Sequence, residues 1–311
     1  MKISVVIPVY QGARTIGTLT DELVAHLKSY ILEVVLVNDG STDNSDEECR
    51  KLFKKYPSIV KYICLAKNFG EHNAVLAGLN NVTGDYTVII DDDFQNPPEE
   101  IDKLVEKAVS SGLDVVYGYY EKKKHSLFRN IGSGFNNAVA NCLLNKPGDL
   151  YLSSFKCMSR FIVSEVIKYN GPFPYIDGLI LRSTKNIGKV LVRHEKRQRG
   201  RSGYTLRKLV RLWVNMFVNF SIYPLRMSTL LGVLFSILGA CLTVFFVIDK
   251  IVHPNMPVGV AAILTSTLTF AGVQMLMLGM MGEYLGKLFM TNNQTPQYVI
   301  RHILSHDNDK K

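Results

Sequence analysis

Three consecutive aspartates, Asp91 to Asp93, are the residues whose type and spacing most directly indicate chemistry. They follow a short apolar run, Tyr86–Ile90, of the kind that forms a buried strand. Alternation along an extended chain sends the Asp91 and Asp93 side chains to one side and Asp92 to the other. Two carboxylates on one side repel each other, and a divalent cation that also binds a diphosphate removes this repulsion. The alternative interpretation is an acidic turn in solvent.

Two further polar groups follow apolar runs in the same way. Asp39 comes after the run Glu33–Val37, and Pro8 and Tyr10 lie at the end of the first apolar run of the chain. The carboxyl ends of parallel strands meet at one edge of a sheet, and ligands bind in the crevice outside that edge. We therefore expect these residues to lie near the three aspartates.

The elements that position these residues alternate between strand and helix patterns through the first 120 residues. The short apolar runs predict strands over Ile3–Pro8, Glu33–Val37, Val60–Leu65, Tyr86–Ile90 and Val115–Tyr119. The intervening segments predict helices over Ala13–Tyr30, Asp43–Tyr56, His72–Leu79 and Pro97–Ser110. This alternation predicts an α/β domain with a doubly wound sheet.

The last third of the chain contains two uncharged apolar runs, at about 227–248 and about 257–282. Each has the roughly 20 residues needed to cross ~30 Å of hydrocarbon. The link between the runs is too short for a domain, so they predict a two-helix transmembrane hairpin. The basic segment Arg193–Arg211 precedes the hairpin and places both of its ends in the cytoplasm.

Two segments before the hairpin have the pattern of basic amphipathic helices, at about 126–144 and 206–225. Such helices suit the lipid headgroup layer, although each could instead pack against its own domain. The predicted organisation is a cytoplasmic catalytic domain over 1–205, a juxtamembrane helix over 206–225, two transmembrane helices within 226–286, and a cytoplasmic tail over 287–311.

Composition restricts the partners. Lys and Arg outnumber Asp and Glu by 36 to 27, which gives a formal net charge of +9. The sequence has no zinc-finger spacing or RNA-recognition motif, so we expect anionic lipid or a phosphorylated substrate, and no nucleic acid. The five cysteines contain no CxxC pair and are expected to be reduced thiols. The chain begins with a strand-like run and lacks a signal-peptide pattern, which predicts a catalytic part that is not exported.

The ordered set of strand-end motifs, from Lys2 to about Asp102, resembles the family 2 glycosyltransferases with a GT-A fold. The resemblance implies that a nucleotide-sugar binds to Pro8, Tyr10, Asp39, Asp91 and Asp92. It also implies that Asp91 and Asp93 hold the divalent metal, Mg²⁺ or Mn²⁺.

The stretch Asp91–Glu99 further resembles the polyprenyl-phosphate glycosyltransferases. That subgroup includes dolichol-phosphate mannose synthases and bacterial undecaprenyl-phosphate glucosyl and aminoarabinosyl transferases. Other segments that are similar to its signatures are Asn68–Asn73, Ser153–Lys156, Arg197–Tyr204 and Phe220–Arg226. Bacterial members carry two membrane helices after the last of these, as predicted here.

The resemblance implies an inverting, metal-dependent transfer of a sugar to a polyprenyl phosphate, with undecaprenyl phosphate and a uridine-diphosphate donor favoured. It implies a cytoplasmic-membrane enzyme whose catalytic domain faces the cytoplasm, and a homotetramer. The lipid phosphate is assigned to Arg129, Arg197, Arg199 and Ser202. The catalytic set is assigned to Asp93, Arg197 and Asp149. A lipid monophosphate is largely dianionic at neutral pH and needs little general-base help, so a base role for Asp149 stays open beside an orienting role.

Two other functions share parts of this pattern. The first is a glycosyltransferase with the same donor site and another acceptor, either a different lipid or a polysaccharide. One such enzyme is a processive polysaccharide synthase, but these synthases usually carry a Gln-x-x-Arg-Trp motif, which is absent here. An inactive membrane scaffold is disfavoured because it has no reason to keep clustered carboxylates at Asp39, Asp91 and Asp93. The sequence does not identify the donor sugar.

Overall fold

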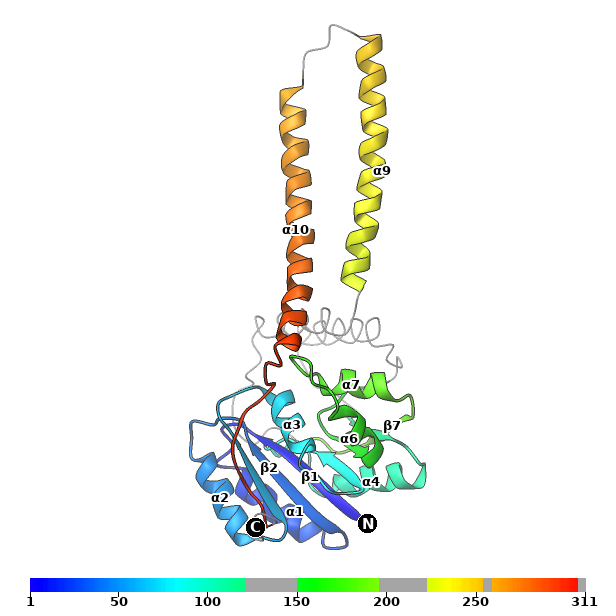
Figure 1. The fold of residues 1–311 in the computed structure, drawn as a ribbon. Helices are drawn as coiled ribbons and strands as arrows, with labels where there is room; N and C mark the ends of the chain where they lie inside the picture. Colours follow the sequence, from blue (N-terminus) through cyan, green and yellow to red (C-terminus); the bar gives the residue numbers. More distant parts are fainter. Residues whose placement is uncertain (121–149, 196–222, 254–258, 307–311) are drawn as a thin grey trace. The chain divides into compact units, whose positions relative to one another are not determined.

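The computed structural model describes residues 1–120, 150–195, 223–253 and 259–306 (Figure 1). The chain divides into two compact units. The first contains residues 1–206 together with 294–311, and the second contains residues 207–293.

Within the described residues, the first unit is built on a mixed sheet in the order β7-β5-β6-β4-β1-β2-β3-β8. The strands are β1 (Lys2–Val9), β2 (Ile31–Asn38), β3 (Val60–Leu65), β4 (Tyr86–Ile89), β5 (Val115–Tyr119), β6 (Lys156–Ser159), β7 (Ile187–Leu191) and β8 (Ile300–Leu304). The central strands β4, β1, β2 and β3 are parallel. β6 is antiparallel to both of its neighbours, and β8 is antiparallel to β3.

Helices cover both faces of this sheet (Figure 1). One face packs against α1 (Ile16–His26), α2 (Ser45–Lys55) and α4 (Glu100–Ser110). The other face carries α3 (Glu71–Leu79), α6 (Arg160–Val166) and α7 (Ile176–Ser183). The central strands are therefore buried on both sides, which explains why they read as nearly continuous apolar runs in the sequence.

Strand alternation assigns the side chains of β1 to the two faces. Ile3, Val5 and Ile7 are fully buried in the core against α1, α2 and α4. Val6 points to the other face, where Gly78 of α3 approaches it closely. A Cβ atom on Gly78 would lie 2.4 Å from Val6 Cγ1, so the contact between α3 and the sheet requires glycine.

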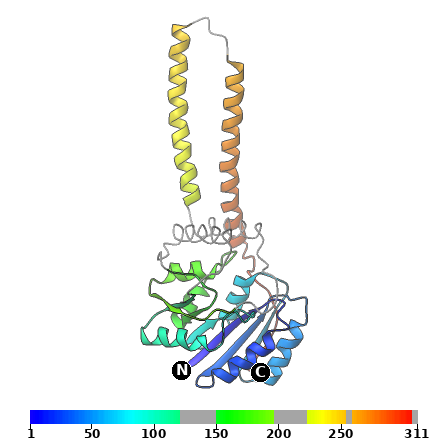
Figure 2. The ribbon, with the colours of Figure 1, turned by 180° about the vertical axis from the view of Figure 1, so that it is seen from behind.

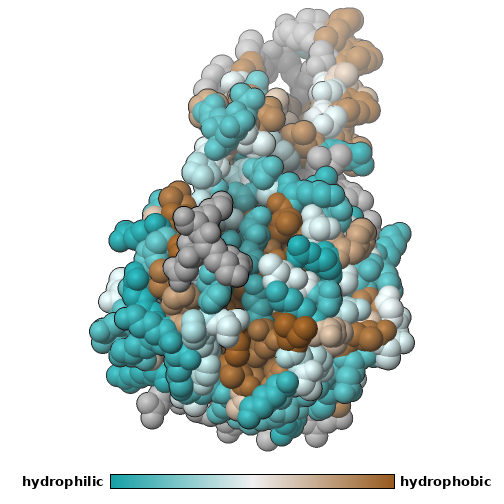
Figure 3. Space-filling view, turned by 60° about the horizontal axis from the view of Figure 1, so that its bottom comes forward, coloured by the Kyte–Doolittle hydropathy of each residue, from teal (hydrophilic) through white to brown (hydrophobic). Residues whose placement is uncertain are grey.

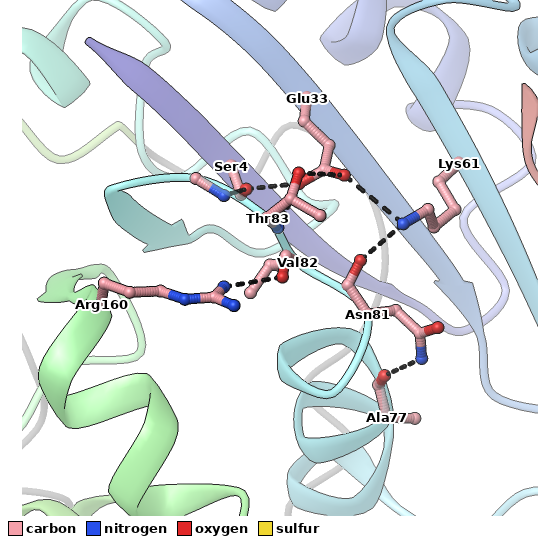
Figure 4. Close-up of polar contacts among 9 residues, drawn as sticks. Ser4, Glu33, Lys61, Ala77, Asn81, Val82, Thr83 and Arg160 are labelled. Atoms are coloured by element: carbon pink, nitrogen blue, oxygen red, sulfur yellow. Dashed lines mark hydrogen bonds and ion pairs between the residues drawn. The ribbon is translucent and has the colours of Figure 1, made fainter. Parts of the chain in front are cut away.

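A hydrogen-bond network joins the amino-terminal ends of the central strands (Figure 4). The Glu33 carboxylate on β2 accepts hydrogen bonds from the Ser4 hydroxyl on β1 and from the Thr83 N–H, the latter at 2.8 Å. Lys61 on β3 lies 3.4 Å from the same carboxylate. Burial raises the pKa of Glu33, but these donors outweigh it, so the pKa is lowered overall. The network fixes the turn that enters β4 and lies at the sheet edge opposite to the predicted site.

The predicted doubly wound α/β sheet is observed as a mixed sheet, because β6 and β8 add antiparallel strands that the sequence did not indicate. β6 has two polar residues among its four, Lys156 and Ser159, so it offers no apolar run to detect. β8 comes after the long helices, and only the folded chain brings it beside β3. The predicted helix over Ala13–Tyr30 is also shorter in the structure, since α1 covers Ile16–His26.

The second unit contains the long helices α9 (Tyr223–Val252) and α10 (Val260–Asn292), seen from behind in Figure 2. Among the described residues, one segment, Ser228–Asp249, is long and apolar enough to cross a membrane. Phe235 of α9 and Phe270 of α10 contact each other edge to face, with ring centroids 6.5 Å apart. The predicted hairpin of two membrane spans stays a prediction. The amphipathic segments predicted at 126–144 and 206–225 lie outside the described residues, apart from 223–225, which begin α9.

Apolar exposure differs between the two units. The visible face of the first unit is mostly hydrophilic (Figure 3). On α9 and α10, large apolar side chains such as Leu230, Phe245 and Leu276 are more than half exposed, at 63%, 61% and 67%. Apolar exposure of this extent indicates a lipid environment or a partner surface for these helices.

The residues from 294 onward belong to the first unit, to which they are attached by the pairing of β8 with β3 and by side-chain contacts. Arg50 Nη2 of α2 lies 2.7 Å from Nε2 of His302 on β8. The Gln297 side chain donates hydrogen bonds to the carbonyl oxygens of Tyr169 and Gly171, at 2.9 and 2.6 Å. The C-terminal segment is therefore part of the sheet domain.

Candidate functional site

The carboxyl ends of the parallel strands bring the predicted donor residues to one edge of the sheet. Val9 at the end of β1 pairs with Asn38 at the end of β2, and Val6 pairs with Ile89 at the end of β4. Tyr10 and Asp39 are the next residues after β1 and β2, and Asp91 is the second residue after β4. Tyr10 reaches the aspartates directly, because its N–H lies 3.3 Å from Asp92 Oδ2 and donates to it.

The Asp39 carboxylate binds the protein's own backbone. Its two oxygens accept hydrogen bonds from the N–H groups of Phe69 and Gly70, at 2.7 and 2.9 Å. Burial raises the pKa of Asp39, and the two backbone donors oppose that rise. The adjacent Gly40 has a φ of +62°, and a Cβ there would lie 2.4 Å from the Asn68 nitrogen. Asp39 thus joins the end of β2 to the loop that precedes α3.

The three consecutive aspartates have different partners. Asp91 Oδ2 accepts a hydrogen bond of 2.6 Å from the Ser154 hydroxyl. Asp93 Oδ1 accepts one of 3.1 Å from the Gln95 N–H. Asp92 lies toward Tyr10 at the end of β1 instead. The segment before β6 therefore contributes Ser154 to the site, although the sequence reasoning gave this serine no role.

Glu71 is a fourth carboxylate of the site that sequence reasoning missed. It is the first residue of α3, and its side chain is exposed. The surrounding protein and the charges of Asp177, Asp93 and Asp39 raise its pKa. The pKa of Asp91 is raised to about 7 by desolvation and then by Glu71 and Asp93. The sequence could have indicated Glu71, because it directly follows Asn68-Phe69-Gly70, the loop whose N–H groups Asp39 binds.

This set of side chains fits a divalent cation. The charges of Glu71 and Asp93 raise the pKa of Asp91, and the charge of Asp93 raises the pKa of Glu71, so the three carboxylates are close enough to repel one another. Carboxylate oxygens are the ligands that Mg²⁺ and Mn²⁺ prefer. A cation shared by these groups would remove the repulsion. The predicted metal ligands Asp91 and Asp93 therefore lie in a suitable environment.

A second cluster with metal-ligand chemistry has a different explanation. The donor atoms of Asp46, Cys64 and His302 lie within 4.8 Å of one another. The Arg50 guanidinium lies between two of them, at 2.8 Å from Asp46 and 2.7 Å from His302. The Tyr62 hydroxyl also donates to Asp46. A cationic side chain already occupies the place of a metal ion, so this cluster stabilises β8 against α2 and β3.

The nearby histidine His72 packs against an aromatic side chain of α7's N-terminal flank. Its ring packs edge to face on Tyr175, with centroids 5.1 Å apart. Burial lowers its pKa to about 4, so the ring is neutral at physiological pH.

A cavity of about 430 Å³ lies beside the loop that follows the aspartates. It is lined by Arg14, Thr15, Thr18, Glu22, Phe94, Pro97, Pro98, Glu99 and Glu195. Asp39, Asp91 and Asp93 are not among its lining residues. This cavity is therefore separate from the carboxylates, and the chemistry of the side chains identifies the candidate site better than the cavity does.

The structure does not place the predicted acceptor residues. Arg129, Asp149, Arg197, Arg199 and Ser202 all lie outside the described residues. Of the predicted donor residues, Pro8 lies at the end of β1, while Tyr10, Asp39 and the three aspartates meet at the edge described above.

Comparison with known proteins gives two kinds of match. The model of the family described as Glycosyl transferase family 2 matches residues 4–165. Curated relatives named undecaprenyl-phosphate 4-deoxy-4-formamido-L-arabinose transferase match along nearly the whole chain. The protein of that name from Yersinia pestis (strain Pestoides F) is 31% identical over 307 residues, which cover 97% of this chain and 94% of the relative. The one from Edwardsiella ictaluri (strain 93-146) is 31% identical over 310 residues.

Solved structures match the fold. Glucosyl-3-phosphoglycerate synthase from Mycobacterium tuberculosis, in complex with Mn²⁺, uridine-diphosphate and phosphoglyceric acid, superposes with a TM-score of 0.51 at 19% identity. The match covers 70% of this chain and 76% of that one. The same enzyme in complex with uridine-diphosphate alone gives a TM-score of 0.50 at 18% identity. These likenesses show that the described sheet and helices have a GT-A-like arrangement.

Proposed function

The chain belongs to glycosyltransferase family 2, and from this premise we propose that it transfers a sugar from a uridine-diphosphate donor to undecaprenyl phosphate. The transfer would be metal-dependent and inverting, and would serve cell-surface polysaccharide or lipid modification. The observation that carries the proposal is the extent of the similarity to the aminoarabinose transferases. It covers 97% of the chain, so it includes the carboxylate site and the apolar helices together.

Asp91 and Asp93 would hold Mg²⁺ or Mn²⁺ in this proposal. The bound cation supplies positive charge that neutralises the diphosphate of the donor as it leaves. The clustering of Glu71, Asp91 and Asp93 supports the assignment, because their mutual repulsion favours a cation. The related fold crystallised with Mn²⁺ and uridine-diphosphate is consistent with this choice of metal and nucleotide.

The chain's own residues would position the donor. Asp39 holds the loop at Phe69 and Gly70 in place, and this loop together with Pro8 and Tyr10 would form the wall for the base and ribose. Asp92 accepts a hydrogen bond from the Tyr10 N–H, so it would fix the end of β1 against the aspartate loop. Such preorganisation favours transfer because the reacting groups are held before the reaction begins.

The acceptor phosphate would be bound by basic residues that follow the described site in sequence. We assign this role to Arg129, Arg197, Arg199 and Ser202, with Arg197 acting also in catalysis. A lipid monophosphate is largely dianionic at neutral pH, so it can attack the anomeric carbon without full deprotonation by a base. Asp149 would orient an arginine or the acceptor. A single displacement inverts the anomeric configuration.

The membrane part of the proposal rests on α9 and α10. Ser228–Asp249 is apolar enough to span, and α10 would complete a hairpin with both ends in the cytoplasm. The catalytic domain, 1–205, would face the cytoplasm, with a juxtamembrane helix at 206–225 and a tail from 287 to 311. A homotetramer is part of the same proposal.

A transfer assay tests the function. The full chain in membranes or nanodiscs is incubated with radiolabelled uridine-diphosphate sugars, with and without undecaprenyl phosphate, and in the presence of Mn²⁺ or EDTA. We expect label in the organic-extractable lipid only when acceptor and metal are both present. Label in a water-soluble polymer would assign a different acceptor. If no donor supports transfer and the chain also fails to bind any nucleotide, the result would support the interpretation as an inactive membrane scaffold.

A further inference from the structure

A short segment after β7 is attached to the loop that follows the three aspartates. The segment consists of Arg193, His194 and Glu195, which belong to the first unit. Arg197 and Arg199, which the proposed function assigns to the acceptor phosphate, follow it within four residues in the sequence. The contacts of this segment therefore bear on how the donor and acceptor residues are brought together.

Arg193 binds the first turn of α4, immediately after the aspartate loop. Its Nε donates a hydrogen bond of 2.6 Å to Glu100, and its Nη2 donates one of 3.0 Å to Glu99. The Glu100 side chain is 1% exposed and also pairs with Lys103 at 2.6 Å, so this carboxylate is fixed within the helix. A guanidinium presents its donors in a rigid fork, so two carboxylates determine its orientation as well as its position.

A backbone contact links the same segment to the aspartate loop. The Glu195 N–H donates a hydrogen bond of 2.9 Å to the Gln95 carbonyl oxygen. The Gln95 N–H in turn donates one of 3.1 Å to Asp93 Oδ1. A single residue therefore contacts both a predicted metal ligand and the segment that leads to the arginines.

An aromatic contact adds a third link. The Tyr120 hydroxyl donates a hydrogen bond of 2.8 Å to Asn96, which is buried in the aspartate loop. The rings of Tyr120 and His194 have centroids 4.1 Å apart and an interplanar angle of 33°. Tyr120 also directly precedes the segment 121–149, which contains Arg129, another residue assigned to the acceptor. Both chain segments that carry the assigned arginines thus begin beside this loop.

The effect of these links is geometric. The side chains of Arg193 and Glu99 are 62% and 51% exposed, and an ion pair of this exposure contributes little to stability. Transfer, by contrast, requires the phosphate oxygen to lie in line with the leaving diphosphate, and a displacement of about 1 Å can lower the rate about 100-fold. Contacts that hold the acceptor segment on the aspartate loop meet this requirement.

We propose that Arg193, held by Glu99 and Glu100, positions the acceptor segment against the aspartate loop so that the lipid phosphate lies beside the donor diphosphate. Arg193 is a positioning residue, which acts through Arg197 and does not bind the substrate itself. The inference rests on the proposed function, because it takes a lipid phosphate as the acceptor.

A different role for Arg193 would be direct attraction of the lipid phosphate by its charge. The two roles predict opposite results when the Glu99 carboxylate is removed. Glu99→Ala makes the chain more positive and frees part of the guanidinium, so direct attraction predicts acceptor use that is unchanged or improved. Positioning predicts poorer acceptor use, because one of the two carboxylates that orient Arg193 is lost.

The test uses the full chain in nanodiscs and measures kcat/KM for undecaprenyl phosphate at a saturating concentration of the uridine-diphosphate sugar that is active in the transfer assay. The affinity for UDP in the presence of Mn²⁺ and the melting temperature are measured on the same samples. Arg193→Gln is expected to lower kcat/KM about tenfold, and Glu99→Ala to lower it several-fold, since Glu100 remains. The double variant Arg193→Gln/Glu99→Ala is expected to lose no more than Arg193→Gln alone, because the two side chains act as a unit. UDP affinity and melting temperature are expected to stay unchanged in all three.

Arg160→Gln is the matched control. Arg160 is also an exposed arginine, and it donates a hydrogen bond of 2.8 Å to the Val82 carbonyl oxygen near the opposite edge of the sheet (Figure 4). This variant is expected to leave all three quantities unchanged. Arg193→Lys keeps the charge but not the fork, and is expected to restore kcat/KM only in part, whereas direct attraction predicts full recovery.

The outcomes separate the inference from the proposed function. Unchanged kcat/KM in Arg193→Gln would overturn the inference, and so would improved acceptor use by Glu99→Ala. Parallel losses of UDP affinity and melting temperature in Arg193→Gln would show that Arg193 is structural only, and would overturn it as well. If the unaltered chain binds UDP but transfers no sugar to undecaprenyl phosphate, the proposed acceptor is wrong and the inference is overturned with it.

Discussion

At the scale of single residues, the role that the sequence motif predicts for Asp39 differs from the contacts that its side chain makes in the structure. The sequence places Asp39 among the nucleotide-binding residues, whereas the structure shows both of its oxygens bound to the N–H groups of Phe69 and Gly70. A carboxylate oxygen has more than one lone pair, so contact with a nucleotide is still available. The residue therefore shapes the loop at the start of α3 as well as any pocket it lines.

Asp39→Asn tests this role in shaping the loop. An amide has one acceptor oxygen, so one of the two backbone N–H groups would face an NH₂ group and lose its partner. We expect a loss of about 1–3 kcal/mol in the free energy of unfolding, with UDP binding weakened at least tenfold. Chemical denaturation and calorimetry measure the two effects. Asp85→Asn is the control, since Asp85 accepts from the Lys2 N–H at the opposite end of the strands; equal effects of both variants would contradict the assignment.

Asp93→Ala tests the metal assignment. The change removes one carboxylate of the predicted pair, so metal-dependent transfer to lipid should fall at least 100-fold while the chain remains folded. The transfer assay is run across a range of Mn²⁺ concentrations. Asp102→Ala serves as a control, because Asp102 is an aspartate of α4 that pairs with His26. Turnover retained by Asp93→Ala would show that Asp93 does not hold the metal.

At the scale of elements, the contact between α3 and the sheet depends on one glycine. Gly78→Ala would place a methyl group 2.4 Å from Val6 Cγ1, which costs about 1–3 kcal/mol by overpacking. Gly17→Ala in α1 is the matched case, because a Cβ there meets no atom within 4 Å. That variant is expected to gain up to about 1 kcal/mol from helix propensity. Melting curves of the two variants should therefore shift in opposite directions, and a stabilised Gly78→Ala would disprove the close packing.

The network at the amino ends of the strands predicts a pH dependence of stability. The folded-state pKa of Glu33 is below its ordinary value of 4.5 because its hydrogen-bond donors outweigh the effect of burial. Its ionised form thus stabilises the fold above about pH 4.5, and this contribution disappears as pH falls through the lower, folded-state pKa. We expect Glu33→Gln to be less stable than the parent at pH 7, by about 1–2 kcal/mol, and the difference to shrink toward pH 3.

Thermal unfolding of the full chain between pH 3 and 7 measures this difference. Glu106→Gln, at an exposed position of α4, is the control and should follow the parent at every pH. A difference between Glu33→Gln and the parent that stays constant with pH would mean that the charge of Glu33 contributes nothing.

At the scale of the whole molecule, α9 predicts how the chain is held in a membrane. Leu238 lies near the middle of the apolar segment Ser228–Asp249 and is 51% exposed. Leu238→Arg should cost about 2.5–3.5 kcal/mol of insertion free energy, because a charge at the centre of a span is unfavourable in hydrocarbon. We expect a smaller fraction of this variant to resist alkaline extraction from membranes, while Leu238→Met behaves as the parent. If alkaline extraction released all of the parent chain from membranes, the prediction that α9 spans a membrane would be wrong.

The two units meet different physical requirements. The sheet domain buries its apolar residues, including those of β1, in its own core. The long helices keep theirs exposed and must find lipid or another protein. The last strand, β8, returns to the sheet domain after both helices, so the domain is complete only when the chain on either side of α9 and α10 is present.

The sequence by itself determined the features that depend on local pattern. Continuous apolar runs identified β1 to β5 within a few residues, because strands buried on both faces need such runs. The same patterns placed Tyr10, Asp39 and Asp91 at strand ends, and the motifs at these ends indicated the family, which the match to Glycosyl transferase family 2 confirms. Local pattern also identified the apolar segment of α9, since length and hydropathy are enough for that prediction.

Only the tertiary structure decided which distant residues meet. β6 and β8 carry little apolar pattern, and their pairing with β4, β5 and β3 depends on contacts across the chain. Glu71 joins the site from α3 and Ser154 joins it from the segment before β6, and no spacing rule connects them with Asp91. Electrostatic interactions depend on distance in space, whereas a sequence records only distance along the chain. For that reason the charge balance of the site became visible only in the folded molecule.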